Sequence, residues 1–245
     1  SPDDYILAAF LQACTPLIAG IFSIVWLRKH YTGLFKLPPM DEIINSYKEG
    51  WSIFVSSLAV NLYTATNVVV LGMLTNNVIV GYYSAADKLI TCVRRGIYAV
   101  SDAIYPFISK MMKDDIPKGL RFIKKQLFLY LVVGLVGCTS LFLFSDTIVK
   151  LLFGADYDLT VDVLRILSFV PLAVAISTVF GEETMLPLNM NSAYSRTLVL
   201  AAFFSLLSIF PLCYMWGAEG VAMTMLLTEF LIMIVMGGLL WKRLL

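Results

Sequence analysis

Seven stretches of about 20 mainly apolar residues follow one another along this 245-residue chain. A helix of that length crosses the hydrocarbon core of a bilayer, and the alternating pattern of β-barrel strands does not run through these stretches. Only 14% of the residues are charged, against roughly 25% in soluble domains. The sequence therefore predicts an all-α, polytopic membrane protein and excludes a soluble globular domain. The predicted spans are Tyr5–Trp26, Ser52–Leu74, Val80–Pro106, Gln126–Phe144, Val161–Phe180, Tyr194–Trp216 and Val221–Trp241.

Lysine and arginine residues predict the orientation of these spans. Of the 18 basic residues, thirteen lie in the linkers 27–51 and 107–125, at Arg196 where the sixth span begins, or at the carboxyl end. The linkers on the opposite side contain only Lys150. Because short cytoplasmic loops are enriched in basic residues, we expect the carboxyl terminus to be cytoplasmic and the amino terminus to lie outside.

Residues typical of catalysis and of metal sites are sparse. The four cysteines lie in apolar stretches without a CxxC pair, and His30 is the only histidine. No Gly-rich phosphate loop or Ser/His/Asp set is present. We therefore expect no metal, no cofactor and no enzymatic activity, and the net charge of +1 gives no reason to expect a nucleic-acid partner.

Several segments carry a family resemblance. The segment from Trp51, WSIFVSSLAVNLYTATNVVVLGMLTNNVIVGYYSAADKLI, resembles the seventh and eighth helices of Wzx-type O-antigen flippases, which belong to the multidrug/oligosaccharidyl-lipid/polysaccharide exporter superfamily. The resemblance continues at IYPFISK (Ile104–Lys110), LLFGADY (Leu151–Tyr157) and WGAEGVAMTMLLTE (Trp216–Glu229), and the opening PDDYILAAFLQACTPLIAGI is similar to the sixth helix.

The resemblance implies a domain organisation. Family members have about twelve helices in two bundles, so we expect a MATE-like half bundle plus one helix, with most of the amino-terminal bundle missing. An odd number of spans and a start at Ser1 agree with that expectation. Residues 1–27 would be the last helix of the amino-terminal bundle, residues 28–50 a cytoplasmic linker between bundles, and residues 51–245 the carboxyl-terminal six-helix bundle.

The third predicted span carries several charged residues. Inserting one such residue on a lipid-facing helix near the bilayer centre costs a free energy of about 2.5–3.5 kcal/mol. Lys88, Arg95 and Asp102 share one helix face because they are seven residues apart, and Asp87 and Arg94 repeat that spacing on an adjacent face. We expect Lys88, Arg94 and Arg95 to attract the pyrophosphate that the resemblance implies. The alternative is pairing with Asp87 and Asp102, or extension of the basic side chains to an interface.

Uncharged polar residues and one further carboxyl also lie within spans. Asn61, Tyr63 and Asn67 could contact sugars or could instead form interhelical hydrogen bonds. Glu229, with Asp87 and Asp102, is a candidate for ion coupling or charge pairing; a hydrogen-bonded neutral carboxyl is the alternative for Glu229. Arg165 has a simpler explanation, an ion pair with Asp162 at the end of a helix.

The resemblance implies a function. It predicts a multi-pass protein of the bacterial inner membrane that moves undecaprenyl-pyrophosphate-linked O-antigen repeat units by alternating access, coupled to a cation gradient. The expected partners are the lipid-linked oligosaccharide, membrane lipids and the O-antigen polymerase machinery. A drug/cation antiporter or another lipid-linked-sugar flippase of the superfamily, and a non-transporting membrane scaffold, remain alternatives.

Overall fold

The computed structural model describes residues 5–30, 38–154 and 156–244, all of whose regular elements are helices. The chain divides into two compact units, Ser1–Glu49 and Gly50–Leu245. The first unit contains α1 (Tyr5–His30) and the start of α2 (Met40–Leu74). Within the predicted domains 1–27 and 28–50, residues 1–4 and residues 31–37, which include Lys36, lie outside the described residues.

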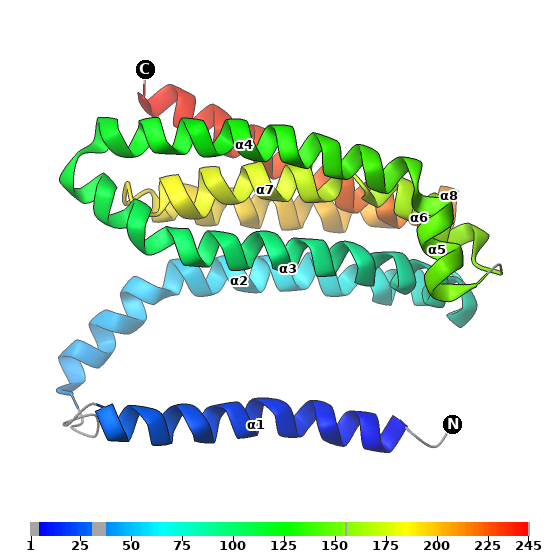
Figure 1. Cartoon of the computed structure of the whole chain (residues 1–245), viewed down its shortest axis with the longest axis horizontal. Coiled ribbons are helices and arrows are strands. Elements are labelled where there is room, and N and C mark those ends of the chain that lie inside the picture. Colours follow the sequence, from blue (N-terminus) through cyan, green and yellow to red (C-terminus); the bar gives the residue numbers. More distant parts are fainter. Residues whose placement is uncertain (1–4, 31–37, 155, 245) are drawn as a thin grey trace. The chain divides into compact units, whose positions relative to one another are not determined.

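The second unit is a bundle of long helices whose ends are set by local capping (Figure 1). The Asn76 carboxamide oxygen accepts hydrogen bonds of 3.0 Å from the backbone N–H groups of Val78 and Ile79, so α3 begins at once after α2. Asp115 caps α4 in the same way through the N–H of Lys118. The elements are α3 (Asn77–Asp114), α4 (Ile116–Leu143), α5 (Ser145–Phe153), α6 (Asp158–Leu167), α7 (Val170–Phe180), the π-helix η2 (Gly181–Met185) and α8 (Asn191–Leu244).

Four described helical segments are long and apolar enough to cross a membrane, which confirms the predicted all-α polytopic class. They are Ile53–Leu74, Ile116–Leu143, Asp158–Met185 and Asn191–Leu244. The last contains two of the predicted spans, because Gly217 adopts φ 54° and ψ −126° and breaks the helix. Residues 191–216 and 218–244 are each about 40 Å long at 1.5 Å per residue, so either part could span a bilayer.

A second glycine near this break, Gly220, allows two backbone segments of α8 to approach closely. A Cβ atom on Gly220 would lie 1.9 Å from the carbonyl oxygen of Leu212, a distance that no side chain could accommodate. The two halves of α8 therefore meet with backbone against backbone. Small residues serve this purpose in membrane helices, where packing rather than the hydrophobic effect holds helices together.

The fifth predicted span ends later than expected. The apolar stretch predicts an end at Phe180, whereas the helix continues through η2 to Met185. In this turn the N–H of Leu186 binds the carbonyl of Gly181, five residues back, and the Thr184 hydroxyl donates to the Val179 carbonyl at 2.7 Å. The turn thus stays helical although its sequence, GEETM, is too polar to register as part of an apolar span.

Polar side chains lie inside the bundle and large apolar ones on its surface. Phe128, Val136 and Phe203 are 64–72% exposed, whereas Glu183 and Thr224 are fully buried. A soluble protein would bury the first group and expose the second. This arrangement is expected of a bundle whose surroundings are lipid.

Candidate functional site

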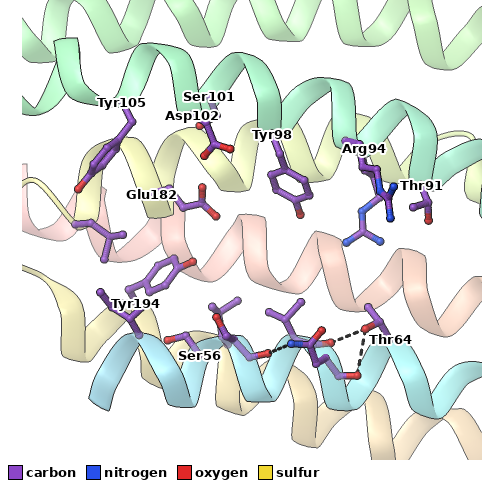
Figure 2. Close-up of a pocket in the computed structure, with 17 residues that line it drawn as sticks. Ser56, Thr64, Thr91, Arg94, Tyr98, Ser101, Asp102, Tyr105, Glu182 and Tyr194 are labelled. Carbon is purple, nitrogen blue, oxygen red and sulfur yellow. Dashed lines mark hydrogen bonds between the residues drawn. The ribbon is translucent and has the colours of Figure 1, made fainter. Parts of the chain in front are cut away.

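A cavity of about 880 Å³ lies within the second unit, between α2, α3, η2 and the first part of α8 (Figure 2). Its lining residues on α3 run from Thr91, near the middle of the helix, to Tyr105, toward the α3–α4 connection. Its polar lining residues are Ser56, Ser57, Asn61, Thr64, Thr91, Arg94, Arg95, Tyr98, Ser101, Asp102, Tyr105, Glu182 and Tyr194. Such a polar space inside a lipid-facing bundle can hold water or a hydrophilic part of a ligand.

Charges of both signs border this cavity. Arg94 and Arg95 approach it from α3, as does Asp102 two turns later, and Glu182 approaches it from η2. Figure 2 shows Arg94 and Tyr98 pointing from α3 into the space above α2, with Glu182 between the two helices. The wall can therefore attract an anionic group at one place and a cationic group at another.

Arg94 is held by a buried network that joins three helices. Its Nη2 atom lies 3.5 Å from Oε1 of Glu229 on α8, and the two side chains are only 10% and 5% exposed. The hydroxyl of Tyr63 on α2 donates to the same carboxylate oxygen at 3.0 Å. Arg94 Nε is buried and has no hydrogen-bond partner among the described residues. The guanidinium is thus paired on one edge and retains a free donor.

Beside the large cavity, a space of about 50 Å³ extends inward to this network. Tyr63 and Glu229 border it, and Tyr98, Glu182 and Tyr194 border both spaces. A space of this size with several polar partners is large enough for a water molecule. Polar contact can therefore extend from the cavity to the buried Glu229 carboxylate.

The predicted polar residues of α2 are divided between two environments. Asn61 lines the large cavity, and its amide nitrogen donates to the Ser57 carbonyl at 2.9 Å. Tyr63 binds Glu229, which is the interhelical contact that the alternative interpretation describes. Asn67 is 2% exposed, and its Oδ1 atom has no hydrogen-bond partner among the described residues.

The remaining predicted residues lie apart from the large cavity or at its edge. Lys88 is exposed and borders a separate pocket of about 450 Å³ near the opposite end of α3, together with Tyr82, Asp156 and Tyr157. Asp87 is half-buried on α3. Arg165 pairs with Asp162 at 3.4 Å, as the spacing predicted.

Sequence reasoning missed Glu182, Glu183, Tyr98 and Tyr194. Glu182 and Glu183 were placed in a linker because the apolar stretch ends at Phe180. Two adjacent carboxyls directly after a span, with no basic residue before Arg196, were the available signal. For Tyr98, the position one turn after Arg94 on the same helix face was the signal.

Comparison with known proteins shows what the chain is similar to. Residues 1–112 match the family described as polysaccharide biosynthesis protein. The chain is 32% identical over 230 residues, or 94% of its length, to a protein of Escherichia coli (strain K12) named "Putative O-antigen transporter". It is 29% identical over 236 residues, or 96% of its length, to a protein of the same name from Shigella dysenteriae.

The chain covers only part of each relative. The chain spans 55% and 59% of the length of the two relatives. No solved structure matches it. The predicted resemblance is nevertheless confirmed by sequence: the chain is a membrane protein that is similar over residues 1–112 to the polysaccharide biosynthesis family and over most of its length to two proteins named as putative O-antigen transporters.

Proposed function

We propose that this chain forms part of a flippase that moves undecaprenyl-pyrophosphate-linked O-antigen repeat units across the bacterial inner membrane. The observation that carries the proposal is the polar cavity of about 880 Å³ within the bundle, whose lining includes Arg94 and Arg95. Arginine can bind phosphate oxygens through two parallel N–H groups. The names of the relatives supply the substrate class.

Arg94 and Arg95 have different roles in this proposal. Arg95 is exposed to the cavity and has no ion pair with a described residue, so it would meet the pyrophosphate first. Arg94 would then donate through Nε while its Nη2 atom remains in contact with Glu229. The hydroxyl and amide groups of Ser56, Asn61 and Thr64 provide a surface for sugar hydroxyls.

In alternating access, the large cavity and the pocket beside Lys88 would be used one after the other. Nine basic residues of the second unit belong to the end of the bundle where α3 meets α4, which we assign to the cytoplasmic side together with the carboxyl terminus. The large cavity lies toward that end and would receive the substrate. Lys88, in the pocket toward the other end, would attract the pyrophosphate after the bundle has opened to the periplasm.

The alternatives make different use of the same cavity. A drug/cation antiporter would bind its substrate through Asp102 and Glu182, which also line the wall. A non-transporting scaffold would have no need of a hydrophilic space of this size within its helices. Transport of the lipid-linked oligosaccharide, alone or beside the O-antigen polymerase machinery, is the function we put forward.

A complementation experiment tests the proposal. The full-length protein is expressed in a bacterium that lacks its own O-antigen flippase, and surface O-antigen is measured by gel electrophoresis. We expect restoration by the unchanged protein, a reduction of tenfold or more by Arg95→Gln, and no loss by the control Lys150→Gln on exposed α5. Full export by Arg95→Gln at equal protein abundance would contradict the role of Arg95. Drug resistance without O-antigen export would favour the antiporter.

A further inference from the structure

A second buried polar cluster lies behind the cavity, between α3, α4 and η2. Its centre is Glu183, whose side chain is completely buried. The hydroxyl of Ser101 on α3 donates to Glu183 Oε1 at 2.7 Å. Gln126 and Tyr130 lie on neighbouring turns of α4, where Gln126 is close to Glu183 and Tyr130 is close to both.

This cluster contains more unsatisfied polar atoms than any other part of the described chain. Glu183 Oε2, both amide atoms of Gln126 and the Tyr130 hydroxyl are buried and have no hydrogen-bond partner among the described residues. Buried polar groups are otherwise almost always paired. A hydrogen on Glu183 Oε2 would account for two of these four atoms, because a protonated Oε2 would become a donor for the Gln126 carbonyl oxygen.

The charges around the turn favour the same conclusion. The titratable side chains around the turn are Tyr98 and Asp102 from α3, Tyr130 from α4, Tyr194 from α8 and Glu182 within η2. None of these is cationic, and Glu183 forms no ion pair with a described residue. A buried carboxylate without a cationic partner is strongly disfavoured, so such a group usually becomes neutral.

Ser101 connects the cluster to the cavity. It lines the cavity wall and also binds Glu183, so a proton can pass between cavity water and the buried carboxyl through its hydroxyl. Both carboxyls lie on the π-helical turn: Glu182 lines the cavity, whereas the next residue, Glu183, binds Ser101 of α3. π-Helical turns within α-helices occur frequently at functional sites.

We propose that Glu183 is a proton-binding site that exchanges with the cavity through Ser101. On uptake, a hydronium ion in the cavity gives one proton to the Ser101 oxygen while the Ser101 hydroxyl hydrogen passes to Glu183 Oε1, which leaves water, a serine hydroxyl and a neutral carboxyl. Release reverses the same steps. Rotation of the neutral carboxyl places its hydrogen on the Gln126 side. Protonation itself does not depend on the proposed transport function.

Infrared difference spectroscopy of the full-length protein in lipid tests this site. The C=O stretching band of a protonated carboxyl is expected at neutral pH, and it should be lost in Glu183→Gln, which keeps the size of the side chain. Asp146→Asn, which removes an exposed carboxylate on α5, should leave the band unchanged. In Ser101→Ala the band should remain, shift in position and exchange with D₂O more slowly.

The outcomes separate the alternatives. A folded Glu183→Gln protein that retains every carboxyl band would overturn the proposal, because Glu183 would then be ionised. Loss of the band from the unchanged protein on replacing choline with sodium at constant ionic strength would also overturn it, in favour of a sodium site. If Glu183→Gln does not fold, an unshifted band with unchanged exchange in Ser101→Ala has the same consequence. Failure of O-antigen export would affect none of these readouts.

Discussion

Removing the charge of Glu229 should destabilise the bundle far more than removing the charge of an exposed residue in a similar ion pair. Arg94 and Glu229 are 3.5 Å apart and at most 10% exposed. At that distance and an effective dielectric constant of about 20, their attraction is about 5 kcal/mol. Loss of one partner leaves an uncompensated buried charge, at a cost of about 3–5 kcal/mol. Glu229→Gln preserves an acceptor for Tyr63, so the change isolates the charge.

A double-mutant cycle measures this effect. Arg94→Gln, Glu229→Gln and the double variant are unfolded reversibly in mixed micelles, and the free energy of unfolding is compared. We expect each single variant to lose about 3 kcal/mol and the double variant to lose clearly less than their sum, with a coupling of about 2 kcal/mol or more.

The exposed pair Asp162–Arg165 is the matched control. Its atoms are 3.4 Å apart, almost the same distance, but its side chains are 53% and 44% exposed. Its coupling should be below about 1 kcal/mol, because water screens the charges. Additivity within about 0.5 kcal/mol for Arg94 and Glu229 would refute the reasoning, since it would mean that the two groups do not interact.

Two further changes test packing around this network and at the break in α8. Tyr63→Phe removes the 3.0 Å hydrogen bond to Glu229 and should lower the free energy of unfolding by about 1.5–3 kcal/mol, the range for bonds to charged groups; no measurable loss would contradict the bond. Gly220→Ala should lower the free energy of unfolding by more than about 2 kcal/mol, because its new Cβ meets the Leu212 carbonyl oxygen. The control Gly137→Ala places its Cβ where no atom lies within 4 Å. In the same unfolding assay it should be neutral or stabilising by up to about 1 kcal/mol. Equal effects of the two alanines would contradict the close approach.

Local chemistry was readable from the sequence, and long-range packing was not. Apolar stretch length predicted the five spans that fall within the four membrane-length segments of the described chain, and the three-residue spacing predicted the Asp162–Arg165 pair. The partner of Arg94 lies 135 residues further along the chain on α8, and no spacing rule connects them. Charge alone identified Arg94 as exceptional, but only the packing of α3 against α8 determines which carboxylate neutralises it.

The end of the fifth span shows a second limit. Hydropathy fell at Gly181, and the polar turn that followed was interpreted as a linker. The turn instead remains helical because its backbone bonds reach five residues back and because Thr184 binds the Val179 carbonyl. Glu183 is buried by helices that are distant in sequence. Burial of this kind depends on the assembled bundle and leaves no periodic pattern.

The central claim is that the cavity binds the pyrophosphate of a lipid-linked oligosaccharide, and direct binding tests it best. The full-length protein in lipid nanodiscs is titrated with labelled undecaprenyl-pyrophosphate oligosaccharide, with the undecaprenyl-linked sugar lacking phosphate as the comparison ligand. We predict that Arg95→Gln weakens binding of the pyrophosphate ligand about tenfold or more, as expected for loss of one charge-assisted hydrogen bond, while Lys150→Gln does not. Equal affinity of the unchanged protein and Arg95→Gln for both ligands would contradict the claim.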